Sequence, residues 1–356
     1  MKHTDYHESR LRKRRLSFIE DGIPSRFVFV LTNKCNLSCD FCFQDRRSLP
    51  KAMTEKDWMD TIEKLPEGSH VTLTGGEPIL FKGFKSIFRE VTRYNTVNII
   101  CNGVMLNDEV MELFLSTENF LVLSISIDTV GNTNRKVKEK DYENMARHLA
   151  SFSDKKKLTS HPAIIDTKTV VTNENSRQLF SIFKHCVEDL KSESHSFQFL
   201  KGNPLQHSDK VTDDFSKLDS KHPIPFYTDI ESIVKQFESV NQYCWENNVR
   251  CFTHPGHINF GPSPNNFKSK LQKYYNNRTF RIEDYDACTA PWESVHINAD
   301  GKVFPCLAYD FGDIRNFSDM RELFNSENAL RFRDTLRKRG LFNACAGCGY
   351  LSAKSK

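Results

Sequence analysis

The stretch FVFVLTNKCNLSCDFC, residues 27–42, decides the fold of this chain. Its first five residues are apolar and rich in aromatic and β-branched side chains, which is typical of a short buried strand. Three cysteines follow at once, Cys35, Cys39 and Cys42, with three and then two residues between them. One loop of this length can place three thiolates at three corners of an iron–sulfur cube and leave the fourth iron open. A zinc site without a nearby fourth ligand and three incidental core cysteines are the alternatives.

Short apolar runs like the first one recur along the chain and alternate with segments of helical spacing. The predicted strands are residues 27–31, 70–73, 97–101, 121–127, 164–171 and 196–200. The predicted helices are residues 55–65, 84–94, 108–115, 142–152 and 176–190. This alternation predicts an α/β fold with a parallel sheet and right-handed crossovers, either open or curled into a barrel. Reactive groups are then expected at the C-terminal ends of the strands.

The chain divides into four predicted parts. Residues 1–26 form a basic N-terminal extension, which we interpret as a solvated terminus, and residues 27–200 form the alternating strand and helix domain. Residues 201–286 are predicted as a connecting region of loops, with one long amphipathic stretch near 226–245, that lines the substrate pocket. Residues 287–356 contain four cysteines around the hairpin-like segment SVHINADGKVFPC, a small β-hairpin and helix domain that would need a metal to hold it together.

Composition indicates a globular protein that is not dominated by charge. The 356 residues are 38% hydrophobic and 27% charged, and the net charge of +4 is too small to predict nucleic acid or a membrane as a partner. No apolar run reaches the roughly 18 residues of a membrane span, and residues 1–21 lack the apolar core of a secretory signal. We therefore expect a cytoplasmic protein whose eleven cysteines are reduced, so metal ligation is the leading explanation for the clustered ones.

Two motifs make the chain resemble the radical S-adenosylmethionine (SAM) superfamily. The motif CNLSCDFC has Phe41 directly before its third cysteine, and TGGEP, residues 74–78, follows the second predicted strand. The resemblance implies a partial (βα)6 barrel, a 4Fe-4S cluster on Cys35, Cys39 and Cys42, and S-adenosylmethionine bound at the open iron. It also implies that an electron, supplied by a reductant such as flavodoxin or ferredoxin, splits the cofactor into a 5'-deoxyadenosyl radical that takes a hydrogen atom from the substrate.

The same resemblance suggests which residues contact S-adenosylmethionine. Glycines let a backbone approach a ligand closely, and the Glu of the GGE motif can accept a bond from the cofactor's ammonium group. Ser124, Ser126 and Asp128 alternate along the fourth predicted strand and are expected to share one face. Of these, Ser126 is the preferred match to the family's cofactor contact. Asn102 and Asp128 can equally cap a turn or a helix. The predicted cofactor contacts are Phe41, Gly75, Gly76, Glu77, Asn102, Ser124, Ser126 and Asp128.

A second group of cysteines lies near the C-terminus. Cys288 precedes the hairpin, Cys306 ends it, and Cys345 and Cys348 form a CxxC. Four thiolates can fully ligate either zinc or a second cluster. The order resembles the twitch domain, a shortened SPASM domain, which implies an auxiliary 4Fe-4S cluster without an open iron. The sequence does not choose between a redox role and a structural role for it.

The substrate is predicted less sharply than the chemistry. Cys101, His254 and His257 are candidates for a hydrogen donor or a base, against buried structural thiols and surface loop histidines. Because only 34 residues precede Cys35, too few for a leader-binding domain, we expect a small polar natural-product intermediate of the sugar or aminocyclitol type. The alternatives are modification of a short peptide or protein, by crosslinking, oxidation or epimerisation, and a non-catalytic zinc or other metal-binding scaffold.

Overall fold

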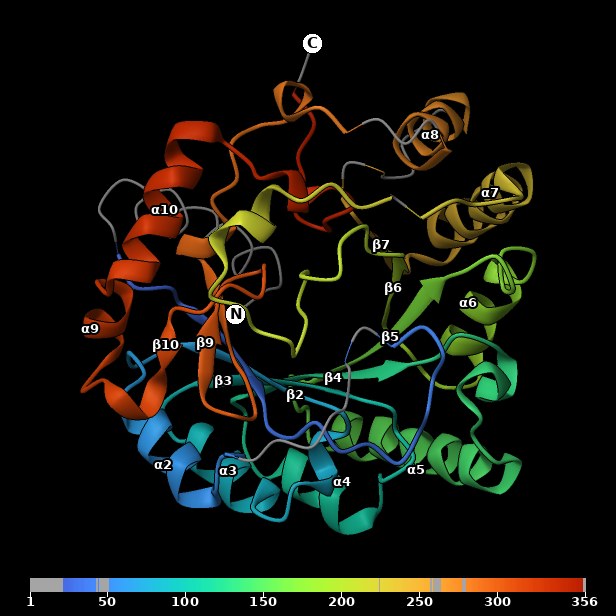
Figure 1. Ribbon diagram of the computed structural model, residues 1–356. Coiled ribbons are helices and arrows are strands. Elements are labelled where there is room, and N and C mark those ends of the chain that lie inside the picture. Colours follow the sequence, from blue (N-terminus) through green and yellow to red (C-terminus); the bar gives the residue numbers. More distant parts are fainter. Residues whose placement is uncertain are drawn as a thin grey trace.

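A ten-stranded sheet forms the centre of the computed structural model, which describes residues 22–42, 44, 51–223, 225–256, 258, 264–276 and 280–354. The strand order is β10-β9-β8-β1-β2-β3-β4-β5-β6-β7, and the sheet curls around an interior space with helices on its outer side (Figure 1). In chain order the strands are β1 (Arg26–Val30), β2 (His70–Thr74), β3 (Thr96–Cys101), β4 (Phe120–Ser126), β5 (Ile164–Val171), β6 (Ser194–Phe199), β7 (Arg250–His254), β8 (Ser294–Ile297), β9 (Lys302–Phe304) and β10 (Gly312–Asp313).

The helices follow the alternation that the sequence predicts. They are α2 (Glu55–Glu63), α3 (Phe84–Val91), α4 (Asp108–Leu115), α5 (Glu139–Leu158), α6 (Leu179–Glu188), α7 (Ile230–Asn247), α8 (Pro264–Leu271), α9 (Met320–Phe324) and α10 (Glu327–Arg339). Helix α2 begins at a capping box, in which Thr54 accepts a bond from the Asp57 N–H and the Asp57 carboxylate accepts one from the Thr54 N–H. The six strands and five helices predicted for residues 27–200 are confirmed, with shifted ends.

Strands β1 to β7 are all parallel and enclose the interior, which confirms the predicted α/β fold with a parallel sheet. Their outward side chains pack on the helices through an aromatic core, in which the rings of Phe88 and Phe114 lie 5.3 Å apart and those of Phe114 and Phe120 lie 4.8 Å apart. In the part of the chain that the structure describes, β7 and β10 are the two edges of the sheet, so the barrel is partial.

The segment predicted as connecting loops contains a further strand and helix. Helix α7 confirms the amphipathic stretch, but β7 and α8 follow it and extend the sheet beyond the six predicted strands. Strand β7 has the sequence RCFTH, in which exposed and half-buried side chains alternate and none is fully buried. The prediction of loops was wrong here because it searched for apolar runs, and an edge strand needs none.

The C-terminal hairpin is part of the same sheet. Strand β8 pairs in parallel with β1, placing Val28 opposite His296, and β9 pairs with β8 in the antiparallel sense. The turn between β8 and β9 is closed by bonds between Asn298 and Gly301 and between Asn298 and Lys302. Gly301 has φ +87°, a conformation that favours glycine, so the predicted hairpin is confirmed.

Candidate functional site

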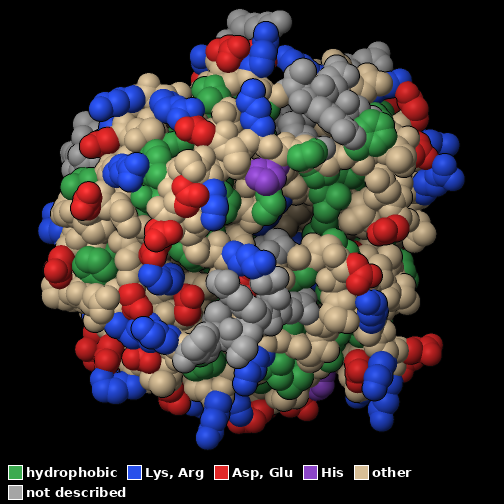
Figure 2. Space-filling view, in the orientation of Figure 1, with side chains coloured by type: hydrophobic (Ala, Val, Ile, Leu, Met, Phe, Trp, Pro, Cys, Tyr) green, Lys and Arg blue, Asp and Glu red, His purple; other side chains and the backbone are tan. Residues whose placement is uncertain are grey.

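A large cavity fills the inside of the curled sheet. Its volume is about 2680 Å³, and its walls come from the inner faces of the parallel strands, the three-cysteine loop, the segment after β6 and the loop after Cys345. Figure 2 shows a hollow near the middle of this face of the molecule, bordered partly by hydrophobic side chains. The cavity therefore brings residues near both cysteine groups to one space.

The first three cysteines lie on the loop after β1 and face this cavity. Cys35, Cys39 and Cys42 are each half-buried and line it together with Phe41. The backbone N–H of Leu37 points at the Cys35 sulfur, 3.5 Å away, a contact that favours a thiolate. Half-burial leaves one side of the group open to the cavity, which suits a cluster with one iron that is not bound by the protein.

The Gly-Gly turn after β2 holds the cysteine loop in place. Gly76 N–H donates to the Thr32 carbonyl at 2.7 Å, and Glu77 N–H donates to the Lys34 carbonyl at 2.9 Å. A β-carbon on Gly75 would lie 2.4 Å from the Thr32 oxygen, and one on Gly76 would lie 2.2 Å from the Lys34 oxygen. Both glycines line the cavity, and their close backbone approach is to the cysteine loop.

Glu77, which the sequence predicts as a cofactor contact, does not line the cavity. Its side chain is fully buried, and its carboxylate accepts bonds from the Asn102 N–H at 2.8 Å and the Ile79 N–H at 3.3 Å. Burial raises the pKa of Glu77 to about 7, against the lowering effect of these two bonds. Glu77 therefore ties the turn after β2 to the end of β3, because its oxygens are already engaged by the protein backbone.

Asn102 directly follows β3 and lies beside the cysteine loop. Its side-chain amide donates to the Asn36 side chain at 2.7 Å and lies 3.8 Å from the Cys35 sulfur. Its side-chain oxygen accepts from the Val104 N–H at 2.9 Å, so the amide orientation is fixed. Asn102 lines the cavity and joins β3 to the first cysteine group.

Of the three residues predicted to alternate on the fourth strand, two face the cavity and one does not. Ser124 and Ser126 line the cavity, and the Ser124 hydroxyl donates to Asp166 at 2.9 Å. Asp128 is fully buried and forms an ion pair with Arg135. Strand β4 ends at Ser126, so the alternation that would have aimed Asp128 inward stops before it reaches that residue.

Arg135 belongs to the site and was missed in the sequence. Its guanidinium lies 5.2 Å from the centre of the Phe41 ring, and one of its nitrogens lies 3.9 Å from the Cys39 sulfur. It lines the cavity from the irregular segment after β4, where no motif marks it. Asp128 thus acts on the cysteine loop through Arg135.

The second cysteine group is more closed than the first. Cys306, Cys345 and Cys348 are buried and Cys288 is half-buried. Burial raises the pKa of Cys348 to about 12, and burial together with the neighbouring thiols raises the pKa of Cys306 and Cys345 well above its ordinary value. Binding of a metal centre at this group would displace the protons of these thiols.

Backbone donors in the second group favour bound thiolates. The Ala290 N–H lies 3.5 Å from the Cys288 sulfur and the Tyr350 N–H lies 3.4 Å from the Cys348 sulfur. In the described residues, no three His, Cys, Asp or Glu side chains are close enough to hold a single metal ion.

The three residues predicted as a hydrogen donor or a base lie in different places. Cys101 is buried at the end of β3 and lines the cavity, and burial raises the pKa of its thiol well above its ordinary value. His254 lines the cavity from the end of β7. His257 lies outside the described residues. No described helix is both long and apolar enough to cross a bilayer.

Comparison with known families agrees with this architecture. The model of the radical SAM superfamily matches residues 29–176, and the model of the iron-sulfur cluster-binding domain called SPASM matches residues 288–349. Fold, cysteine loop and family match together define a radical SAM domain. The chain thus contains a radical SAM domain followed by a C-terminal SPASM-type domain, and these two domains imply a 4Fe-4S cluster, S-adenosylmethionine and auxiliary iron–sulfur binding.

Two curated relatives and a solved structure resemble the chain over most of its length. The sporulation killing factor maturation protein SkfB of Bacillus subtilis (strain 168) is 25% identical over 297 residues, which are 82% of this chain and 62% of SkfB. The tungsten-containing aldehyde ferredoxin oxidoreductase cofactor-modifying protein of Pyrococcus furiosus is 22% identical, covering 91% of this chain and 86% of that protein. The structure of Streptococcus suis SuiB bound to precursor peptide SuiA superposes with a TM-score of 0.60 at 15% identity, covering 95% of this chain and 74% of SuiB.

Proposed function

We propose that this radical SAM enzyme modifies a peptide, with an auxiliary iron–sulfur cluster assisting the reaction. The observation that carries the proposal is the cavity of about 2680 Å³ inside the sheet. Pockets for small ligands usually measure about 300–1,000 Å³. A cavity of this size has room for S-adenosylmethionine and an extended peptide segment beside it.

The proposed ligands of the first cluster are Cys35, Cys39 and Cys42, which face the cavity, and the proposed ligands of the auxiliary cluster are Cys288, Cys306, Cys345 and Cys348. With an electron from an external reductant such as flavodoxin or ferredoxin, the first cluster and S-adenosylmethionine would supply the 5'-deoxyadenosyl radical. The chain's own residues contribute by positioning the cofactor. Asn102, Ser124 and Ser126 line the wall beside the cysteine loop and offer hydrogen-bonding groups to the cofactor.

The relatives support a peptide more than the sugar or aminocyclitol expected from the sequence. SkfB is named as the maturation protein of a sporulation killing factor, and SuiB has been crystallised with a precursor peptide. The expectation of a small-molecule substrate rested on the number of residues before Cys35, and that number does not determine the width of the cavity. The non-catalytic scaffold is dropped, because the chain is an enzyme.

The test is to find a substrate by mass. The chain is reconstituted anaerobically with iron and sulfide and given S-adenosylmethionine and dithionite. It then receives either peptides encoded by short reading frames beside its gene or a panel of sugars and aminocyclitols. We expect one peptide to change mass, for example by losing two hydrogen atoms, and to raise 5'-deoxyadenosine formation above the rate without peptide. Turnover of a sugar or aminocyclitol, with every peptide unchanged, would overturn the proposal.

Two cysteine variants control this test. Cys39→Ala removes a proposed cluster ligand and should abolish both products. Cys186→Ala is the matched control, because this cysteine is buried in α6 and does not line the cavity. It should retain iron and peptide modification.

A further inference from the structure

The residues that line the cavity carry an excess of positive charge. Only two carboxylates, Asp166 and Asp213, are among the described residues of its wall. The cationic residues of the wall are Arg26, Arg135, Lys168, Lys201, Lys210, Lys217, Arg250 and Lys270. A concave site lined by one sign of charge attracts ligands of the opposite sign.

Part of this charge is neutralised inside the protein. Lys168 lies 2.8 Å from the Asp166 carboxylate, which also accepts bonds from Ser124 at 2.9 Å and Ser194 at 2.7 Å. Arg135 is paired with Asp128. These two cations are therefore not the ones that attract a further anion.

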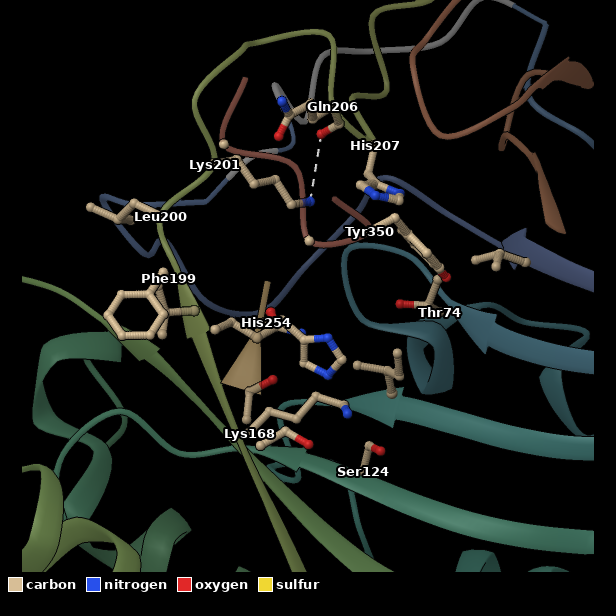
Figure 3. Close-up of a pocket in the computed structure, with 18 of the residues that line it drawn as sticks. Thr74, Ser124, Lys168, Phe199, Leu200, Lys201, Gln206, His207, His254 and Tyr350 are labelled. Atoms are coloured by element: carbon tan, nitrogen blue, oxygen red, sulfur yellow. Dashed lines mark hydrogen bonds between the residues drawn. The ribbon is translucent and has the colours of Figure 1, made fainter. Parts of the chain in front are cut away.

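Four further basic side chains, on the wall across the cavity from Lys168, form what we name the basic group: Arg26, Lys201, His207 and His296. Arg26 comes from the start of β1 and His296 from β8, which pairs with β1. Lys201 and His207 come from the segment after β6. Figure 3 shows Lys201 and His207 on one side of the cavity, across from His254 and Lys168.

Direct contacts join the two histidines to each other and Arg26 to Tyr350. His207 Nδ1 lies 3.0 Å from His296 Nε2, and the Arg26 guanidinium donates to the Tyr350 hydroxyl at 2.9 Å. The Arg26 guanidinium also donates to the Thr72 hydroxyl, at 3.4 Å. Within the described part of the chain, no carboxylate pairs with Arg26, His207 or His296.

The hydrogen-bonding capacity of the group follows from its contacts. One imidazole donates an N–H to the other across the His207–His296 contact, so at least one N–H of the pair is left for a ligand. Arg26 is half-buried and its contacts are to hydroxyl groups. A half-buried guanidinium beside an N–H donor, without a carboxylate, is complementary to an anion.

We propose that the basic group binds a carboxylate of the substrate, so that the enzyme prefers acidic peptides. This inference rests on the proposed function and names the kind of peptide. The carboxylate belongs to an Asp or Glu side chain or to a peptide C-terminus. It is distinct from the carboxylate of S-adenosylmethionine, because Arg26 begins β1 and the cysteine loop follows the other end of that strand, about 13 Å away.

The experiment selects peptides by affinity. Reconstituted holoenzyme is immobilised anaerobically with S-adenosylmethionine and without reductant, and is given random dodecapeptide libraries with free or amidated C-termini. The retained peptides are sequenced. We expect at least about a twofold rise in Asp and Glu frequency over the input, and a fall in Lys and Arg. A rise in Asp and Glu frequency in the amidated library would show that the bound carboxylate belongs to a side chain. Retention of peptides from only the library with free C-termini would show that it belongs to the C-terminus.

Variants connect the selection to the basic group. Arg26→Gln and Lys201→Gln should each bring the acidic preference down toward the input frequency, while S-adenosylmethionine binding stays unchanged. The two variants are independent, so one that fails to retain iron does not end the test. Lys184→Gln is the matched control, because this lysine is exposed on α6 and does not line the cavity. It should keep the preference.

The outcomes separate the inference from the function on which it rests. Retained peptides without an acidic preference, or a preference unaffected by both variants, would overturn the inference and leave peptide modification standing. A loss of S-adenosylmethionine binding in both variants would assign the group to the cofactor instead. Retention of no peptide from either library would overturn the proposed function and the inference with it.

Discussion

Replacing Gly76 by alanine should detach the first cysteine loop from the sheet. The new β-carbon would lie 2.2 Å from the Lys34 carbonyl oxygen and 2.6 Å from its carbon. These atoms are backbone, so no side-chain rotation can relieve the overlap. The chain can accommodate the methyl group only by moving the segment that leads directly to Cys35.

The loss of unfolding free energy in Gly76→Ala can be calculated from the contacts that hold the turn. The movement breaks the Gly76 bond to Thr32 and the Glu77 bond to Lys34, each contributing about 1 kcal/mol. Steric overlap in a packed site adds about 1–3 kcal/mol. The expected loss of about 3–5 kcal/mol is a large part of the roughly 5–15 kcal/mol that stabilises a typical domain.

The assay measures iron and stability together. Wild type, with two clusters, should retain about eight iron atoms per chain after reconstitution, and Gly76→Ala about four, because only the auxiliary group stays intact. The variant should also form no 5'-deoxyadenosine. Gly256→Ala is the control, because a β-carbon there meets its nearest atom, the Thr253 oxygen, at 4.0 Å. Full iron content and unchanged unfolding free energy in Gly76→Ala would refute the reasoning.

Three further predictions concern buried groups around the two clusters. Cys345→Ala should lower the iron content to about four atoms per chain yet still cleave S-adenosylmethionine with dithionite, which iron analysis and 5'-deoxyadenosine assays check. Asp128→Asn should cost about 3 kcal/mol, because it leaves the Arg135 guanidinium largely buried without its charged partner, and denaturant unfolding measures this. The pKa of Glu77 is raised to about 7, so its stabilising contribution is present at low pH and is lost as the pH rises through 7. Wild type should therefore lose about 3 kcal/mol relative to Glu77→Gln between pH 5 and pH 8; parallel curves for the two proteins would contradict this.

The sequence predicts the central strands well, because those strands are buried on both faces. An apolar run such as residues 27–31 has the same appearance in the sequence whichever neighbours it pairs with. The pairing of β8 with β1 could not be predicted, since it joins residues more than 260 positions apart and depends on how far the sheet curls. The hairpin itself was predictable, because its turn chemistry is local.

The candidate site shows a similar limit. The sequence places the Gly-Gly-Glu turn after the second strand, and the structure shows that this turn bonds to the cysteine loop. Motif spacing does not reveal that Glu77 points into protein, because a carboxylate near a cofactor and one that caps the backbone have the same spacing. The basic group is invisible to motif analysis, since Arg26, His207 and His296 meet only after the sheet has formed.

The two cysteine groups differ in exposure, and this difference bears on how the enzyme divides its chemistry. The first group is half-buried and faces the cavity, as a site that binds an exchangeable cofactor requires. Three cysteines of the second group are buried, and Gln206 donates to the carbonyls of Ala344 and Ala346 beside them at 2.9 and 2.7 Å. Gln206 belongs to the segment that carries Lys201 and His207, so one short stretch contacts the auxiliary loop and lines the cavity. A substrate carboxylate held by the basic group would thus lie in a cavity that residues near both cysteine groups border.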